Sequence, residues 1–313
     1  MDPSIRRPYV CTLSPKTLEK AKRELNEDPD TRDAKIDELR AKFKKERPEI
    51  KLPPEDAFFV RYLRNKKYDV DRAFKMIVNY YEVRRKYPEL YNNCRPSAYK
   101  QLYELGIQGI LPKRDNQGRL VSIGKMSLWD PDRFDYDFLM AGYLLSMEKM
   151  IQDEETQVNG IVVVGDYEGL KMKHVLKLGP TQAKKQMDCI MNAIPIRFKA
   201  AHYIRQPDIF ETMFSIFRPF MSAKLIKRLH FHGQEYGTLH DYVPSSILPP
   251  EFGGQFMDFN CNEWYENLMK CDAEFEYMDQ FGIPKASDVL GGTAQGVDAS
   301  GGIAGSFKKL SVD

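Results

Sequence analysis

Two groups of side chains in the sequence have the types and the spacing to support chemistry. Asp166 and Glu168 follow a strand-like apolar run, at the position where α/β enzymes hold catalytic groups. His230 and His232 alternate along another run, so they would share one strand face and could bind zinc with a third residue. Two alternating histidines are also common as purely structural residues. The chemistry that such residues could perform is metal-assisted or carboxylate-assisted hydrolysis.

A hydrolase needs more than these side chains. Its site holds a nucleophile, a base and an oxyanion donor, and the sequence contains no G-x-S-x-G elbow, P-loop or G-x-G-x-x-G fingerprint. We therefore predict that the protein is not an enzyme, has no metal site and needs no cofactor. A hydrolase that uses Asp166 and Glu168 stays open as an alternative.

Residues 208–221 form an amphipathic helical pattern. At 100° per residue, its apolar side chains fall within an arc of roughly 160°. These side chains are Ile209, Phe210, Met213, Phe214, Ile216, Phe217, Phe220 and Met221. Such a face covers either a sheet, as in an ordinary core helix, or a bound lipid, and Met repacks easily in both settings. Pro219 interrupts the helical hydrogen bonding near the end of the segment and offers a place to bend.

Basic residues gather around this helix. Segment 197–232 holds seven Lys or Arg residues and two acids, a net charge of +5, whereas the whole chain carries +2. Arg197 and Lys199 would share a strand face, and Lys224 and Arg228 would share a helical face. A local patch of this kind suits an anionic membrane, where each cation contributes about 1 kcal/mol, and argues against a general nucleic-acid binder. A solvated surface without function is the alternative.

Composition indicates a globular protein of the cytoplasm. The 313 residues are 42% hydrophobic and 29% charged, no apolar run approaches the ~18 residues of a membrane span, and the first residues lack the apolar region of a signal peptide. The five cysteines are scattered and include no C-x-x-C pair, so no disulfide framework is expected. We expect a monomer that visits membranes only transiently.

The pattern of elements changes along the chain and predicts an α/β fold. Residues 1–100 carry only helical signals, 101–280 alternate strands with helices, and 281–313 form a Gly-rich flexible tail. Helices are expected from Ser14-Pro15 onward and at 33–45, 57–64, 71–85, 136–151, 174–193 and 208–221. Strands are expected at 119–125, 161–166, 198–204 and 229–232, and should form a largely parallel sheet with crossover helices.

The helix expected at 136–151 is apolar nearly all round, so it should be buried on two sides. One side can contact the sheet, and the other needs another protein element or a bound apolar ligand. Glu148 is the exception within this apolar stretch. It is either an ion-paired carboxylate near the helix end or a polar anchor at one end of a lipid cavity.

Five motifs occur in a fixed order along the chain. They are FVRYLR at 59–64, EETQVNG at 154–160, DYEG at 166–169, HFHG at 230–233 and LPPEFGG at 248–254. Together they resemble the CRAL-TRIO lipid-transfer family, and most closely its branch of tocopherol and retinaldehyde carriers. The resemblance covers most of the chain. It implies a helical N-terminal domain, then an α/β cage with a mixed sheet, and a mobile gate helix that corresponds to residues 208–221.

The resemblance also implies roles for individual residues. The phosphoinositide-binding cations of the tocopherol carriers match Arg197, Lys199, Lys224 and Arg228. The lipid pocket matches Met140, Tyr143, Met147, Ile161, Gly165, Cys189, Ile190, Ala201, Met213, Ile216 and Met221, to which the gate pattern adds Phe210, Phe214 and Phe217. Glu148 matches a carboxylate that meets the polar end of the ligand in retinaldehyde-binding relatives.

Two pocket positions depart from the tocopherol carriers. Tyr143 stands where they have a small hydroxyl residue, and Gly165 stands where they have an aromatic one, so one cavity wall should be narrowed and another widened. The sequence thus predicts a carrier that encloses one hydrophobic lipid, whether tocopherol-, retinoid- or prenyl-like. It exchanges that lipid at phosphoinositide-containing membranes. A lipid-regulated scaffold for protein interactions is the alternative.

Overall fold

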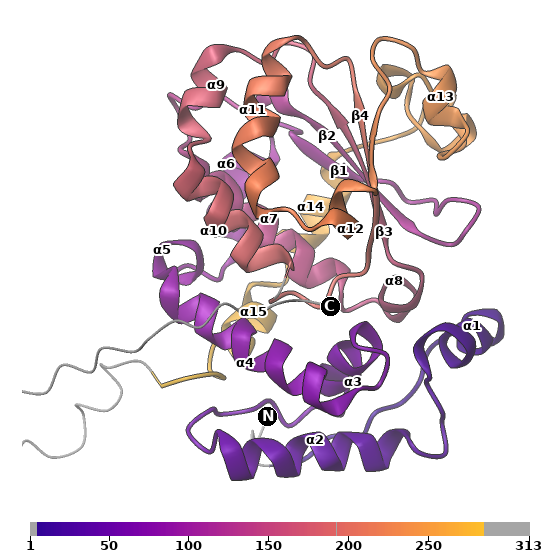
Figure 1. Ribbon diagram of the computed structural model, residues 1–313, viewed down its shortest axis with the longest axis vertical. Helices are drawn as coiled ribbons and strands as arrows, with labels where there is room; N and C mark the ends of the chain where they lie inside the picture. Colours follow the sequence, from indigo (N-terminus) through magenta and orange to yellow (C-terminus); the bar gives the residue numbers. More distant parts are fainter. Residues whose placement is uncertain (1–4, 192, 285–313) are drawn as a thin grey trace, which may run out of the picture. The chain divides into compact units, whose positions relative to one another are not determined.

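The computed structural model describes residues 5–191 and 193–284. The predicted tail lies outside them apart from residues 281–284. Within the described chain, a group of helices comes first and a five-stranded sheet with its covering helices follows (Figure 1). The predicted fold, an N-terminal helical region followed by an α/β region with a mixed, mainly parallel sheet, is confirmed.

The first helices begin where the sequence signals are. The Ser14 hydroxyl caps α1 by accepting from the Thr17 backbone N–H at 3.3 Å, Pro15 occupies the first helical position, and Asn26 ends the helix in a left-handed conformation. The helices of this region are α1 (Pro15–Leu25), α2 (Arg32–Glu46), α3 (Asp56–Asn65), α4 (Val70–Lys86), α5 (Pro88–Tyr91), η1 (Pro96–Tyr99) and α6 (Lys100–Tyr103).

The sheet has the order β1-β2-β3-β4-β5, in which β1 runs antiparallel to β2 and all other neighbours are parallel. The strands are β1 (Gln108–Ile110), β2 (Leu120–Lys125), β3 (Ile161–Asp166), β4 (Phe198–Ile204) and β5 (Leu229–Phe231). The four predicted strands are present to within a residue at each end. The sequence missed β1, which has only three residues.

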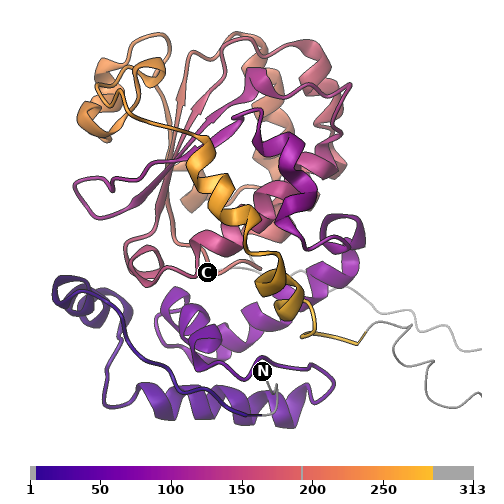
Figure 2. The same ribbon diagram turned by 180° about the vertical axis from the view of Figure 1, so that it is seen from behind.

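Helices cover both sides of the sheet (Figure 1). Those after β2 are η2 (Met126–Leu128), α7 (Tyr136–Met150), α8 (Glu154–Asn159), α9 (Met172–Lys177), α10 (Pro180–Met191), α11 (Ile209–Phe217), η3 (Arg218–Phe220), α12 (Ala223–Ile226), α13 (Gly237–His240), η4 (Ser245–Ile247), η5 (Pro250–Phe252), α14 (Asn262–Met269) and α15 (Asp272–Met278). α9, α10 and α11 lie on one side, and the segment with α13 lies on the other. α14 and α15 lie at the front in the opposite view, where α14 packs beside α6 (Figure 2). None of the described helices is both long and apolar enough to span a bilayer.

Two predicted helices are corrected by the structure. Residues 174–193 do not form one helix, because α9 ends at Lys177 and α10 begins at Pro180, whose ring disfavours a helical conformation in the residue before it. In the segment 208–221 the α-helix ends at Phe217, and the chain passes Pro219 as a 3₁₀ turn before Met221 becomes extended. The interruption expected at Pro219 is therefore present.

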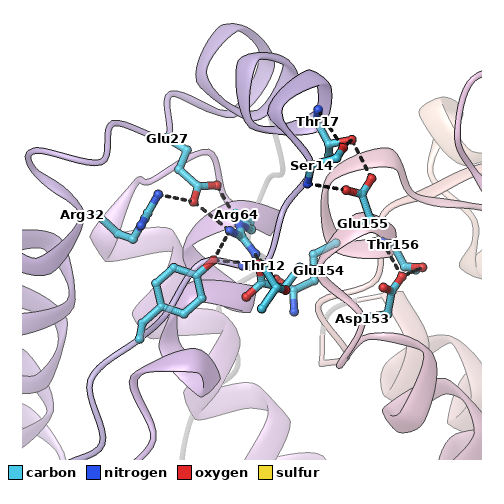
Figure 3. Close-up of polar contacts among 12 residues, drawn as sticks. Thr12, Ser14, Thr17, Glu27, Arg32, Arg64, Asp153, Glu154, Glu155 and Thr156 are labelled. Carbon is cyan, nitrogen blue, oxygen red and sulfur yellow. Dashed lines mark hydrogen bonds and ion pairs between the residues drawn. The ribbon is translucent and has the colours of Figure 1, made fainter.

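The arginine of an ion pair buried within the N-terminal region also binds the segment before β3 (Figure 3). The Arg64 guanidinium of α3 donates to the Glu27 carboxylate at 2.7 and 2.8 Å and to the Gln157 side chain of α8 at 2.7 Å. Both members of the Arg64–Glu27 pair are fully buried. Beside it, the Glu155 carboxylate accepts from the Ser14 backbone N–H at 2.9 Å. The helical region and the α/β region also share one continuous hydrophobic core.

Candidate functional site

A cavity of about 260 Å³ lies between the sheet and helices α7, α10 and α11. Its lining is mainly aliphatic, aromatic and methionine side chains. This volume lies just below the range of about 300–1,000 Å³ of pockets that bury one drug-sized ligand, so the space holds at most one small molecule. The cavity expected between helix 136–151, the sheet and the gate helix is present.

Helix α7 has two apolar sides with different partners. Tyr136, Leu139, Tyr143 and Met147 recur at intervals of three and four residues and line the cavity on one side of the helix. The other side packs against α5 and the N-terminal helices, within the shared core. The structure therefore supplies the protein element that the sequence allowed for one side of the helix, and on the other side the helix faces the sheet across the cavity.

Successive side chains along each strand point to opposite faces of the sheet. Ser122, Val163, Ala201 and Tyr203 face the cavity, whereas the intervening residues pack on the far face with α13 and the turns after it. Two charged residues border the cavity with their backbone but direct their side chains to that far face. Lys125 pairs with Glu251 at 3.5 Å, and Asp166 pairs with Arg205. Of the described residues that line the cavity, none directs a charged side chain into it.

Most predicted pocket residues line the cavity. They are Tyr143, Met147, Ile161, Gly165, Ile190, Ala201, Phe210, Met213, Phe214, Phe217 and Met221. Four predicted residues do not: Met140, Glu148, Cys189 and Ile216. Met140 and Cys189 are fully buried in the core shared with the N-terminal helices, on the sides of α7 and α10 that face away from the cavity. Ile216 is partly buried on a side of α11 that does not reach it.

Glu148 was predicted as a possible anchor for the ligand, but it lies on the side of α7 that faces α3 and α4. Its Oε1 is buried without a hydrogen-bond partner among the described residues. Burial raises the pKa of this carboxyl, against the attraction of the Arg84 and Arg61 guanidinium groups. Glu148 is also not the surface or ion-paired carboxylate of the other prediction, because these guanidinium groups lie near it but no described Lys or Arg forms an ion pair with it.

Gly165 does not widen the cavity as the sequence suggested. The Tyr167 ring, from the turn after β3, lies where a side chain at position 165 would be, and a Cβ built there would lie 2.8 Å from Tyr167 Cε2. Sequence reasoning missed Tyr167, because a residue in a turn has no periodicity that reveals its direction. It also missed Ser122, Val163 and Tyr203, which strict alternation along the predicted strands could have identified.

Helix α11 covers the cavity through its aromatic face. Phe210 and Met213 are only 4% and 5% exposed. The Phe210 ring lies 4.7 Å from that of Tyr167 and 5.3 Å from that of Tyr203, measured between centroids. Phe214 meets Phe231 of β5 edge to face at 5.5 Å. These contacts are apolar and do not depend on a fixed direction. If lipid replaced the aromatic rings as the partner of α11, no hydrogen bond would be lost.

The predicted cations fall into two groups. Arg197, Lys199 and Arg228 lie together, and burial followed by the charge of Arg197 lowers the pKa of Lys199 to about 8. Arg197 donates to the Val158 carbonyl at 2.6 Å, and Arg228 donates to the Phe198 carbonyl. Lys224 is exposed on α12 and lies near Lys66 instead.

One further cation of this surface was missed by the sequence. The Lys20 ammonium of α1 donates to the Asn159 side chain at 2.8 Å and lies close enough to Arg197 and Lys199 for their charges to affect one another. Lys20 is separated from Arg197 by most of the chain up to β4. No local spacing could therefore have placed them together.

The residues that suggested hydrolytic chemistry have structural partners. Asp166 and Glu168 both pair with Arg205. His230 and His232 stack with His202 on the far face of the sheet, and the His202 Nδ1 lies 2.9 Å from His232 Nε2. Within residues 5–191 and 193–284, no group of three or more His, Cys, Asp or Glu side chains is arranged to hold a metal ion.

Comparison with known proteins shows which family the chain belongs to. Residues 106–254 match the CRAL/TRIO domain, and residues 28–101 match the Pinta-like UBA domain. Over 287 residues the chain is 37% identical to the human protein named alpha-tocopherol transfer protein-like, covering 91% of this chain and 83% of that protein. The chain belongs to the CRAL-TRIO family.

Other CRAL-TRIO relatives agree with this assignment. Human clavesin-2 is 34% identical over 278 residues, which cover 87% of this chain and 85% of clavesin-2. The crystal structure of Sfh5 superposes with a TM-score of 0.53 at 14% identity, covering 79% of this chain and 99% of that one, and so supports the fold alone. The CRAL/TRIO match contains the whole sheet, the cavity and α11, which places the candidate site within the lipid-binding domain of a lipid-transfer family.

Proposed function

We propose that this CRAL-TRIO protein is a cytoplasmic carrier that encloses one hydrophobic lipid and exchanges it at phosphoinositide-containing membranes. The lipid is cargo and undergoes no covalent change. The observation that carries the proposal is the apolar cavity closed by α11, since Phe210, Met213, Phe214 and Phe217 both cover the space and contribute to its wall. A molecule can enter or leave on this side only when α11 moves.

The surface around α11 supports exchange at a membrane. In α9, which packs against α11, Met172 and Leu176 are 52% and 75% exposed. α9 is nevertheless well anchored, because His174 is buried and its Nε2 lies 3.0 Å from the Trp129 carbonyl oxygen. Exposed apolar residues on a fixed helix beside Lys171 and Lys177 suit the interface of a bilayer, where apolar side chains enter the lipid and cations meet anionic headgroups.

The basic surface supports the part of the proposal that concerns phosphoinositide-containing membranes. Arg197, Lys199, Arg228 and Lys20 gather on one surface, and Lys224 and Lys227 flank the partly exposed Ile226 on α12. A multiply charged headgroup gains from several cations at once, and each contributes about 1 kcal/mol near the surface. Carboxylates are few there, with Glu24 paired to Arg197 at 3.7 Å.

The experiment that tests this function begins with the purified full chain. Organic extraction followed by mass spectrometry should recover one apolar molecule in about equal amount to the protein. The reloaded protein should move that molecule between donor and acceptor vesicles, and faster when the acceptor contains phosphatidylinositol phosphates. If the protein binds none of the lipids offered, a scaffold for protein interactions would be favoured over a carrier.

A further inference from the structure

The linker between the sheet and α11 is short and mostly stiff. Residues 205–208 join the end of β4 to the start of α11. The ring of Pro207 fixes its own φ and restricts Gln206 to extended conformations. Asp208 is already helical, with φ −53° and ψ −35°. Arg205 is therefore the linker residue whose backbone has the most freedom to rotate, and a rotation there would swing the whole of α11.

Arg205 has an unusual backbone conformation. Its φ is +51°, which lies in the left-handed region. A residue with a Cβ is disfavoured there, and arginine lacks the short polar side chain that lets asparagine or aspartate adopt this conformation more readily. Such a conformation persists only where surrounding contacts hold it. The observed position of α11 therefore depends on the contacts of Arg205.

Arg205 is held by its backbone and by its side chain. The backbone N–H donates to the Gly233 carbonyl at 2.7 Å. The guanidinium donates from Nε to Asp166 Oδ1 at 3.1 Å, contacts the other oxygen of Asp166, and pairs with Glu168. Asp166 is buried, and its Oδ1 also accepts from the Glu168 backbone N–H at 3.0 Å. Because the carboxylate is fixed and the guanidinium is a rigid fork, these contacts specify one orientation of Arg205.

The two carboxylates flank the residue against which α11 packs. Tyr167 lies between Asp166 and Glu168 in the turn after β3, and its ring centroid is 4.7 Å from that of Phe210. Phe210 belongs to the first turn of α11 and is buried. Arg205 thus ties the start of α11 to the turn that supports its first aromatic residue.

The backbone conformation of Arg205 and its ion pairs depend on each other. If residue 205 left the left-handed region, its side chain would leave β4 in another direction, and the guanidinium would lose the carboxylates. Opening would therefore break the ion pairs and relieve the unfavourable φ, which favours two discrete arrangements of α11 over a continuous range.

We propose that Arg205 is the positioning residue that holds α11 closed, and that its separation from Asp166 and Glu168 is a step in the opening of the cavity. This inference rests on the proposed carrier function and specifies how its gate is controlled. The side chain of Glu168 is 64% exposed and that of Arg205 is 22% exposed. Water therefore reaches the pair and can replace its contacts when the helix moves.

The position of α11 can be measured without cargo, by the distance between two spin labels. The labels are attached at Thr212→Cys on α11 and Lys45→Cys on α2, both exposed, after the five native cysteines are replaced. We expect one dominant distance with Arg205 present. Arg205→Ala loses the ion pairs and keeps a Cβ, so a second distance should appear. Arg205→Asn and Glu168→Gln should give a smaller second population, because asparagine tolerates the left-handed backbone and Glu168→Gln leaves Asp166 in place.

A second measurement follows the release of cargo. Full-length protein loaded with radiolabelled hexadecanol is mixed with phosphatidylcholine vesicles, and the label that leaves the protein is counted. Arg205→Ala should release it at least about tenfold faster, as expected for the loss of one hydrogen bond between charged groups. Arg205→Lys keeps the positive charge and should restore both the distance and the release rate most of the way.

Arg47→Ala is the matched control. Arg47 also pairs with two carboxylates, Glu49 and Glu82, and its side chain is 26% exposed, but it follows α2 in the N-terminal region. This variant should change neither the distance nor the release rate. Equal effects of Arg47→Ala and Arg205→Ala, or an unchanged distance in Arg205→Ala, would overturn the inference.

Two further outcomes have a defined meaning. If Arg205→Ala does not fold, as judged by circular dichroism, Glu168→Gln decides: a second distance supports the inference, and the natural distance alone overturns it. Failure of the natural protein to retain hexadecanol would count against the carrier function. It would not count against the role of Arg205, which the spin-label distances test by themselves.

Discussion

The ring of Tyr167 fills the space in the cavity wall that a side chain at Gly165 would otherwise take, because it lies 2.8 Å from where a Cβ at residue 165 would be. The first carries no side chain, and the second fills the space from the turn that follows β3. The Tyr167 ring therefore lies among apolar strand residues, although Tyr167 itself belongs to a turn and not to a strand. The wall of the cavity depends on both residues.

Gly165→Ala should accordingly destabilise the protein and weaken ligand retention. The added methyl overpacks the wall and displaces the Tyr167 ring, so we expect a loss of about 1–3 kcal/mol in the free energy of unfolding, measured by urea titration. Gly124→Ala is the control on the neighbouring strand, because its Cβ would meet the Ile107 carbonyl oxygen at 3.4 Å, an ordinary contact. Equal stability losses in the two variants would contradict this account of Gly165.

The Arg64–Glu27 pair provides a second prediction. Arg64→Met leaves the Glu27 carboxylate fully buried beside Arg32 alone, 3.1 Å away. Removal of one member of a buried pair costs about 3–5 kcal/mol, which urea unfolding would measure. Lys35→Met breaks an exposed pair with Glu38 and should cost less than about 1 kcal/mol. Similar losses for both substitutions would show that the junction in Figure 3 is not a principal stabiliser.

The stacked histidines predict how stability depends on pH. Burial, then the charges of His230 and His232, lowers the pKa of His202 to about 3, and burial also lowers that of His232. Arg119 opposes protonation of this cluster, and Asp241 favours it. Because the folded state holds fewer protons, stability is complete above about pH 6.5 and falls as the pH drops below it, by about 1.4 kcal/mol per pH unit for each such histidine.

His202→Gln removes that titration while keeping a polar side chain on β4. Its unfolding free energy should therefore depend less steeply on pH between about 6 and 4 than that of the natural protein. Urea titrations at a series of pH values provide the comparison. If the two slopes are equal, His202 is not a principal source of the acid sensitivity.

The basic surface should govern membrane affinity without affecting cargo. Alanine at Arg197, Lys199, Lys224 and Arg228 should weaken binding to phosphoinositide vesicles by about 1 kcal/mol per charge, and added salt should have the same effect. Because Lys199 has a pKa near 8, affinity should also fall as the pH rises through 8, and Lys199→Ala should abolish that dependence. Vesicle sedimentation measures both effects.

Ligand retention in solution should be unchanged in the same variant, which separates the membrane surface from the cavity. Alanine at Lys44 and Lys45, exposed on α2, is the control for a simple loss of positive charge. Should these two substitutions weaken sedimentation as much per charge as those around Arg197, attraction to the vesicles would be general and the assigned surface would have no special role.

The sequence predicted most of the fold because its periodicities are local. The apolar run at 161–166 and the cap at Ser14, followed by Pro15, need only neighbouring residues to be recognised, and the structure reproduces both elements. The break at Pro180 was missed because the apolar spacing of 174–193 continues across it. β1 was missed because three residues between turns have too little pattern to distinguish a strand.

The site was predicted less completely, for reasons of tertiary packing. Met140 and Cys189 are as apolar as residues that face the cavity, and only the docking of the N-terminal helices decides which side of α7 and α10 is covered by protein. Glu148 faces those same helices. Lys20 joins Arg197 through the packing of α1 against α8. Residue spacing in a single sequence does not show which distant segments contact each other.

The central claim is that α11 must move for cargo to pass. Phe214 of α11 and Phe231 of β5 are in ring contact at 5.5 Å. Cysteines at these two positions can therefore be bridged by a short bis-methanethiosulfonate once the five native cysteines are replaced. This reagent forms a reducible disulfide with each thiol and releases methanesulfinate. The protein with Phe231→Cys alone is the control for the reagent. We predict that the bridged protein transfers no lipid between vesicles and that reduction restores transfer. Transfer by the bridged protein at the unbridged rate would contradict the claim.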